Sequence, residues 1–431
     1  MGAIEGHASP AGTEPEPSPT IAPDPFEAAA RGLDAADVRW CRLRDRDGGQ
    51  EDDILVNRAD LSTARTALGH AGWREHRHLG HGTHRSFYTF DPEGDRWLKI
   101  DTVTALDFGR WQEWRPQLAA GCLARSAAGA NGRTLAPDDA FWALLFHELL
   151  DRPGTAPRRA ERLRQLAAGA RDDGPGAEAI RPFLPRAWSP ATVIVAAAEG
   201  DVDRLAGLGR SLSGRIARRP SAIARRVVGR GLRWLDHRDP PFLRAGRTVA
   251  LLGPDGAGKS ALVDLVGRGG PMPIRSVYLG LYGGSRARLR ARGLPGLGLA
   301  RRLTAIWRGW LIGWWHAQRG RLVVFDRHPY DARLADPNAG SLLGRLRRAI
   351  LGHALPAPDV VIVLDAPAEV LFARKPEHSL ERIEDQRRRY LSLAGHLERA
   401  YVVDASAPLD EVARGVTSIA WKGHDPRPGG R

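Results

Sequence analysis

The 431-residue sequence has little of several features that would assign it to particular protein classes. Its two cysteines, Cys41 and Cys122, are too few for a disulfide framework or a four-thiolate zinc site, so we expect buried, inert thiols. It contains no run of about 18 apolar residues, which excludes a transmembrane helix. Residues 1–20 contain neither a basic nor an apolar segment, so no secretory signal is visible. These absences predict a cytoplasmic protein.

Lysine is also scarce. Lys and Arg total 64 residues, but only Lys99, Lys259, Lys375 and Lys422 are lysines. With 50 Asp and Glu residues, the formal net charge is +14. An excess of arginine suits nucleic acid, an acidic membrane surface or phosphorylated small molecules as partners. Solvated arginines on exposed faces are an equally weighted alternative.

Length and composition predict several folded domains. At about 100–200 residues per domain, the chain is long enough for two or three. We expect a disordered, Pro- and Glu-rich tail over 1–36, a small α+β domain over 37–136, an all-helical segment over 137–240 and an α/β domain over 241–431.

Hydrophobic patterns support these divisions. The first domain alternates like strands and includes a hairpin around the turn at 91–95. No strand pattern occurs from 137 to 246, where capped apolar helices recur. The last part alternates short apolar runs with helices, which predicts a parallel sheet with helices on both faces. Its expected strands are 248–252, 322–325, 360–364 and 400–403.

The sharpest motif is GPDGAGKS at residues 253–260, which follows an apolar strand and precedes a helix. It matches the phosphate-binding loop pattern in the required strand–loop–helix setting. Gly253, Gly256 and Gly258 permit backbone conformations and close approaches that a Cβ would block. Backbone N–H groups from there to Ala261, including those of Asp255 and Ala257, are expected to face phosphate oxygens.

Two side chains of the loop suit nucleotide chemistry. Lys259 supplies a compact charge to the β- and γ-phosphates of ATP, and the Ser260 hydroxyl is a ligand for Mg²⁺. Position 259 is lysine in a chain that uses arginine at nearly all of its other basic positions, because the loop encloses a compact cation better than a planar guanidinium.

The later strands of this domain add charged candidates. Asp326 and Arg327 end one apolar strand, at the sheet edge where open α/β sheets hold ligands. We expect Asp326 to help hold Mg²⁺ and Arg327 to bind an acceptor phosphate; a surface ion pair is the alternative. A basic turn containing Arg374 follows the strand that ends at Asp365, which suits charge stabilisation during phosphoryl transfer.

These motifs resemble the thymidylate kinase family of P-loop kinases over about residues 245–420. The resemblance implies an α/β P-loop fold in which Asp255 touches the acceptor and Asp326 and Arg327 orient acceptor phosphate and metal. It also implies that a catalytic arginine comes from the lid, with Arg374 first and Arg382 second. The family's usual nucleobase-binding residues are not found in 271–320, so the acceptor is undetermined.

Trp307, Trp310 and Trp314 recur at helical spacing within that region. Helix packing is the favoured interpretation, since aromatic stripes usually face cores. A stacking surface for an acceptor and a membrane-interface face are the alternatives.

The first domain carries acids with metal-binding potential. Glu51 and Asp53 alternate at the start of a strand, and Asp101 lies on a later strand. Three converging carboxylates would hold two divalent ions for nucleotidyl transfer. The order of elements over 38–105 weakly resembles the nucleotidyltransferase fold, but the Gly-Ser signature is missing. We favour a degenerate, non-catalytic domain.

Four histidines cluster in the same domain, at His76, His78, His81 and His84. Metal ligation is one hypothesis. A solvated loop, or a loop near phosphate, is the favoured one, because glycines and arginines interrupt the set.

The sequence thus predicts a P-loop kinase that uses ATP and Mg²⁺ to phosphorylate a small acceptor. One alternative is a two-site enzyme with nucleotidyl transfer in the first domain. Another is an arginine-rich protein that binds nucleic acid or a partner and uses ATP as a switch, with nucleic acid the less favoured ligand. A homodimer stays open.

Overall fold

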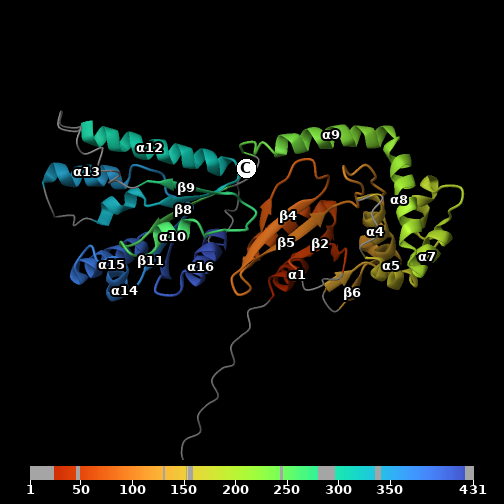
Figure 1. The fold of residues 1–431 in the computed structure, drawn as a ribbon, viewed down its shortest axis with the longest axis horizontal. Helices are drawn as coiled ribbons and strands as arrows, with labels where there is room; N and C mark the ends of the chain where they lie inside the picture. Colours follow the sequence, from red (N-terminus) through yellow and green to blue (C-terminus); the bar gives the residue numbers. More distant parts are fainter. Residues whose placement is uncertain are drawn as a thin grey trace, which may run out of the picture.

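The computed structural model describes residues 24–44, 49–129, 132–151, 153, 159–242, 246–279, 297–334 and 341–422. Figure 1 shows two α/β bodies along one axis, with a helical segment at the end beyond the first. The fold class is α/β, with an all-parallel C-terminal sheet, as the sequence predicts. No described helix is long and apolar enough to cross a bilayer.

The N-terminal body is built on a seven-stranded mixed sheet in the order β3-β4-β5-β2-β1-β7-β6. The predicted hairpin is present, with β4 and β5 antiparallel. Strands β3, β6 and β7 and helix α3 were not predicted, because each is too short for a clear pattern. The bounds are β1 Trp40–Arg42, β2 Glu51–Val56, β3 Arg74–His76, β4 Arg85–Asp91, β5 Arg96–Val103, β6 Ala127–Gly129, β7 Gly132–Thr134, α2 Leu61–His70 and α3 Ala119–Arg125.

Helix α1, Pro25–Ala35, corrects the predicted disordered tail over 1–36. Asp24 caps it by accepting a hydrogen bond from the backbone N–H of Phe26 at 2.9 Å. Phe26 and Leu33 are buried in a core with Trp73 and residues of α2. The prediction failed because the composition of the segment is tail-like and its apolar stripe is narrow. Residues 1–23 lie outside the described part.

The helical segment is confirmed over the described residues from 137 to 240, where no strand occurs. Its core continues into the N-terminal sheet, since Cys41, Leu55 and Val103 belong to the same buried cluster as the helices. Both cysteines are free and buried, and burial raises the pKa of Cys41 to about 12. The bounds are α4 Pro137–Leu150, α5 Ala160–Ala167, α6 Pro175–Ile180, α7 Pro190–Glu199, α8 Val202–Ala217 and α9 Pro220–Asp236.

The C-terminal sheet has five parallel strands in the order β12-β11-β8-β10-β9. All four predicted strands are present, and the fifth, β9, was missed because its exposed residues break the apolar run. Helices α10 and α16 cover one face and α12 and α13 the other (Figure 1). The bounds are β8 Arg247–Leu252, α10 Lys259–Val263, β9 Ile274–Tyr278, α12 Leu297–Gln318, β10 Leu322–Asp326, α13 Leu342–Gly352, β11 Val360–Asp365, α14 Ala368–Arg374, α15 Leu380–Gly395, β12 Ala400–Asp404 and α16 Leu409–Lys422.

The two sheets are joined by aromatic contacts between β4, β5 and α16. The rings of Trp97 and Trp421 meet edge to face with centroids 4.7 Å apart. Trp421 Nε1 donates to the carbonyl oxygen of Tyr88 at 3.0 Å, and Trp97 Nε1 donates to that of Arg268 at 3.2 Å. The contact therefore combines apolar burial with satisfied indole N–H groups.

Candidate functional site

The loop at 253–260 begins where β8 ends. Strand β8 is central, with β10 on one side and β11 on the other, so the chain adds later strands to both sides of it. Open α/β sheets bind ligands outside the carboxyl ends of the strands at such a switch point. The sheet therefore places the glycine-rich loop where a ligand site is expected.

The glycines of the loop adopt conformations that other residues disfavour. Gly253, Gly256 and Gly258 have φ of 143°, 89° and 85°. A Cβ at Gly253 would lie 2.5 Å from the carbonyl oxygen of Leu364, and one at Gly256 would lie 2.7 Å from that of Leu371. The first two glycines thus permit close packing on β11 and α14, whereas Gly258 has open space and is required by its φ alone.

Lys259 reaches back across the loop. Its Nζ donates hydrogen bonds to the carbonyl oxygens of Gly253 and Pro254, both at 2.7 Å. The side chain is buried, and burial together with the charge of Arg327 lowers the pKa of Lys259 to about 8. The amine is therefore mostly protonated at neutral pH and held in the mouth of the loop.

Ser260 and Asp326 meet at the ends of neighbouring elements. Ser260 is the second residue of α10, and Asp326 is the last residue of β10. The Ser260 hydroxyl donates to Asp326 Oδ2 at 3.3 Å. A hydroxyl beside a carboxylate is a donor set of oxygens, which Mg²⁺ prefers.

A chain of charged and polar groups runs from the loop into α15. Arg327 Nη2 donates to Asp255 Oδ1 at 2.6 Å, and its Nη1 lies 3.8 Å from Asp331 Oδ2. The Tyr390 hydroxyl in turn donates to Asp331 Oδ1 at 3.1 Å. Arg327 has a φ of 67°, a conformation that costs a non-glycine residue about 1–2 kcal/mol and is typical of functional sites.

The pKa values in this chain of groups are shifted in opposite directions. Burial raises the pKa of Asp331 to about 6, although Arg327 and the Tyr390 hydroxyl oppose the rise. Burial also acts to raise the pKa of Asp255, but the charges of Arg327 and Lys259 outweigh it, so this pKa falls below its usual value. Asp255 is therefore the ionised partner that holds Arg327 in place.

The basic turn lies on the other side of the loop. Arg374 Nη1 donates to the carbonyl oxygen of Ala405 at 2.7 Å, and Nη2 donates to that of Ser406 at 3.4 Å. The next residue, Lys375, has its Cβ 3.5 Å from where a Cβ on Gly256 would lie. Its charge also acts on Asp255. Arg382 is exposed in the first turn of α15.

The structure thus gathers most of the predicted site residues around one loop. Ala257 is buried within the loop and Ala261 is exposed in the first turn of α10. The structure adds Asp331, Tyr390 and Lys375. Sequence spacing gave no signal for the first two, which meet across 59 residues. The scarcity of lysine could have indicated Lys375.

The N-terminal acids do not form a comparable centre. Asp53 and Asp101 are register partners on the parallel strands β2 and β5, as the metal hypothesis requires. Each is paired with a cation, however: Asp53 with Arg44, and Asp101 with Lys99 at 2.7 Å. Among the described residues, no group of three or more His, Cys, Asp or Glu side chains could hold a metal ion.

The histidine cluster packs against α9, where His78 lies 3.5 Å from Asp236, and three of its four members stay partly exposed. The rings of His76 and His78 lie 4.8 Å apart, and those of His78 and His81 lie 5.5 Å apart. Burial and the nearby charge of Arg233 lower the pKa of His81 to about 4. The segment is thus half-buried against α9, so the predicted solvated loop is present only in part.

Comparisons with known proteins find likenesses to solved structures but no family. No protein-family model matches the sequence. Among solved structures, deoxyadenosine kinase from M. mycoides is 17% identical, with a TM-score of 0.31, over 39% of this chain and 96% of that one. Thymidylate kinase from Candida albicans is 15% identical, with a TM-score of 0.29, and the match covers 41% of this chain and 91% of that one. Each of these two likenesses covers about two fifths of this chain.

Proposed function

We propose that the chain is a P-loop phosphotransferase that uses ATP and Mg²⁺ to phosphorylate a small acceptor, either a nucleoside monophosphate or another phosphorylated or hydroxyl compound. The observation that carries the proposal is the loop at 253–260. Its positive-φ glycines and the buried Lys259 amine lie at the switch point of a parallel sheet, where such a loop would offer N–H donors and one cation to a phosphate chain.

The two ends of the site suit the two substrates. On the nucleotide side, Lys259 and the loop amides hold the β- and γ-phosphates, and Ser260 and Asp326 are the groups that would hold Mg²⁺. The metal, when bound, neutralises phosphate charge. On the acceptor side, Asp255 fixes Arg327, whose guanidinium suits bidentate recognition of a phosphate.

Transfer needs little covalent chemistry from the protein. An acceptor oxygen forms a bond to the γ-phosphorus while the bond from that phosphorus to the bridging oxygen of ADP breaks. We assign to Arg374 and Lys375 the stabilisation of the developing charge. Arg374 must first leave the carbonyl oxygens of Ala405 and Ser406, so we assign it to a closed state of the turn.

The decisive experiment compares ATP turnover in the native protein, Lys259→Ala and Lys422→Ala. Lys422 is an exposed lysine at the end of α16, so its variant controls for the loss of a lysine as such. We expect Lys259→Ala to lose about a hundredfold or more of the turnover while remaining folded by circular dichroism, and Lys422→Ala to keep it. Equal turnover in all three proteins would reject the assignment.

A screen with labelled ATP identifies the acceptor. Nucleoside monophosphates, sugars and lipid-linked precursors are offered in parallel, and the transferred label is followed. Arg327→Ala should raise the KM of the true acceptor more than that of ATP, because Arg327 lies on the acceptor side. Nucleotidyl transfer by the first domain is the weaker candidate, since its acids are neutralised by Arg44 and Lys99.

A further inference from the structure

Helix α12 has two apolar faces, of which only one is used by the core. Ile306 and Ala317 are buried against the sheet. A Cβ at Gly309 or Gly313 would lie 2.6 Å from Leu279 Cδ2 or 2.5 Å from Phe325 Cε1, so these glycines also face inward. This inner face explains how the helix packs, and Trp310 borders it.

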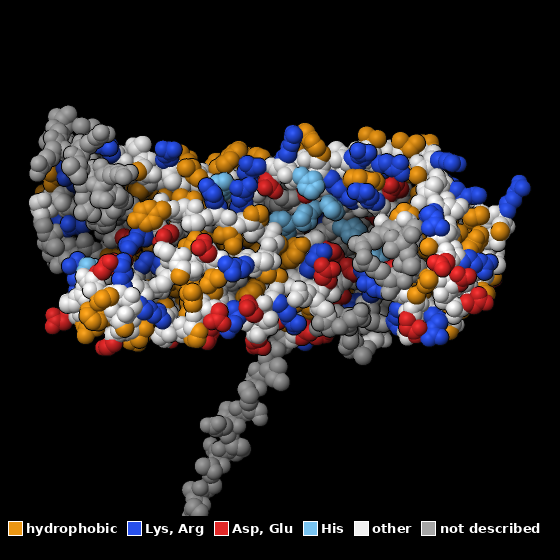
Figure 2. Space-filling view, viewed as in Figure 1, with side chains coloured by type: hydrophobic (Ala, Val, Ile, Leu, Met, Phe, Trp, Pro, Cys, Tyr) orange, Lys and Arg blue, Asp and Glu red, His pale blue; other side chains and the backbone are white. Residues whose placement is uncertain are grey.

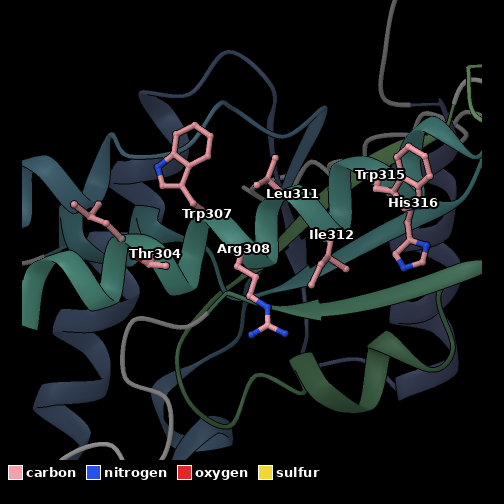
Figure 3. A pocket seen from close by; sticks show the side chains of 8 residues that line it. Thr304, Trp307, Arg308, Leu311, Ile312, Trp315 and His316 are labelled. Carbon is pink, nitrogen blue, oxygen red and sulfur yellow. The ribbon is translucent and has the colours of Figure 1, made fainter.

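The opposite face of α12 carries exposed apolar side chains, which none of the residues that the structure describes covers. Trp307 is 41% exposed, Leu311 50% and Trp315 44%. With Thr304, Arg308 and Ile312 they line a shallow hollow of about 920 Å³ along the outside of the helix (Figure 3). The expectation that the tryptophan stripe serves helix packing is therefore wrong for Trp307 and Trp314, which is 37% exposed.

Helix α9 is amphipathic, but its polar face packs on the protein and its apolar face is exposed to solvent. Its inner face is polar: Arg225 donates to the carbonyl oxygen of Glu113 at 3.1 Å, and Arg233 donates to that of Gly80 at 2.9 Å. The outer face is apolar, with Val227 65% exposed and Trp234 57% exposed. Ile223, Val228 and Leu235 are also exposed on this helix. A helix that turns its apolar side to solvent leaves that side for a partner.

The two outer faces are continuous. The backbone N–H of Phe242 donates to the carbonyl oxygen of Gln318 at 2.7 Å, so the segment that follows α9 meets the C-terminal end of α12. Phe242 is 69% exposed, and its ring lies 6.3 Å from that of Trp314. Both helices run along the same long edge of the molecule (Figure 1), where apolar and basic side chains alternate (Figure 2). We call this surface, from Ile223 to Trp234 through Phe242 to Trp307, the apolar edge.

The side chains beside the apolar edge are positively charged, which favours an anionic partner. Helix α12 contains no Asp or Glu, and the one acid of α9, Asp236, is buried. Arg230, Arg238 and Arg308 are exposed along the edge, and Arg238 stacks on Trp234. A second copy of the chain would bring arginine against arginine. Nucleic acid would match the charge but leave the valine, isoleucine and leucine side chains uncovered.

An anionic lipid surface satisfies both requirements. Interfacial helices place Trp and Leu at the boundary between headgroups and acyl chains while Arg contacts anionic headgroups. Neither helix is suited to cross a bilayer. We propose that the apolar edge binds the protein peripherally to membranes that contain anionic phospholipid. This inference does not depend on the proposed phosphoryl transfer.

Vesicle flotation tests the binding. The full chain is mixed with vesicles of phosphatidylcholine alone, or of phosphatidylcholine with phosphatidylglycerol, at low and high salt. We expect it to float with the anionic vesicles and to bind less at high salt. The double variant W234S/W307S should partition about tenfold more weakly. The control V195S/L409S replaces exposed apolar residues of α7 and α16 and should partition like the native protein.

A fluorophore locates the contact. Both native cysteines are buried, so a cysteine introduced as Val227→Cys or Leu311→Cys can be labelled with an environment-sensitive dye. We expect a blue shift from both positions on anionic vesicles, and none from Val195→Cys. Absence of flotation, or flotation without these shifts, overturns the proposal. So does a dimer in vesicle-free light scattering that W234S/W307S abolishes, or an equal blue shift at Val227→Cys with RNA.

Discussion

At the residue scale, the site is organised by groups whose burial is offset by specific partners. Lys259 is buried but retains two carbonyl acceptors, and Asp255 stays ionised because Arg327 and Lys259 lie beside it. The strained backbone of Arg327 is held by ion pairs on both sides. Such over-determined strain is typical of positions that must present a side chain to a ligand.

The lowered pKa of Lys259, about 8, predicts how nucleotide binding depends on pH. A bound polyphosphate favours the protonated amine, so binding above pH 8 must take up a proton. The affinity therefore falls as pH rises above that value, by up to about tenfold per pH unit, and is insensitive to this group below about pH 7. Calorimetric titration in buffers of different ionisation enthalpy measures both the affinity for the nucleotide and the number of protons taken up on binding.

The matched variant is Lys259→Arg, whose guanidinium stays charged throughout this range. It should bind ATP more weakly than the native protein but without proton uptake near pH 8–9. A native affinity that stays constant from about pH 7 to about pH 9 contradicts the prediction.

At the element scale, an ion pair adds to the apolar packing that holds α15 on the sheet. Arg387 donates to both carboxylate oxygens of Asp365, each at 2.9 Å, and these bonds raise the pKa of Arg387. The two side chains are 19% and 17% exposed. Because Asp365 ends β11, the pair fixes the helix that carries Tyr390 beside the site.

Arg387→Ala should lower the free energy of unfolding by about 1–3 kcal/mol, because it leaves the Asp365 carboxylate partly buried without its cation. Urea unfolding followed by circular dichroism measures the loss. The control Arg388→Ala removes the next arginine of α15, which is exposed, and should change stability by less than about 0.5 kcal/mol. Equal losses in the two variants would contradict the role of the pair.

At the scale of the whole molecule, the two α/β bodies are joined through Trp97 and Trp421. Trp97→Ala removes the ring contact and the hydrogen bond to Arg268; because Trp97 is half-buried, the loss should cost less than the about 3–5 kcal/mol of a fully buried aromatic side chain. We expect thermal unfolding to separate into two calorimetric transitions, as joined domains become independent.

Trp97→Phe keeps most of the ring contact and loses only the indole N–H. It should therefore lower the unfolding temperature by less than half as much as Trp97→Ala does. A single cooperative transition in Trp97→Ala, at the native temperature, would show that the bodies are joined by other contacts.

The sequence alone determined the features that depend on local pattern. The strand–loop–helix context of GPDGAGKS, the parallel C-terminal strands and the all-helical middle segment were all predictable, because short-range periodicity and glycine placement encode them. Helix α1, edge strand β9 and the short strands of the first sheet were not predictable, because tertiary contacts stabilise them more than their own pattern does.

Only the tertiary structure decided which side chains meet and which faces are left open. The pairing of Asp331 with Tyr390, and of Arg44 with Asp53, depends on how distant elements pack. Helical spacing shows that Trp307 and Trp314 share a stripe, but a helix has the same period whichever side the sheet covers. The face of α12 that carries Gly309 and Gly313 packs on the sheet, because glycine permits the closest approach. Trp307 and Trp314 are therefore exposed to solvent.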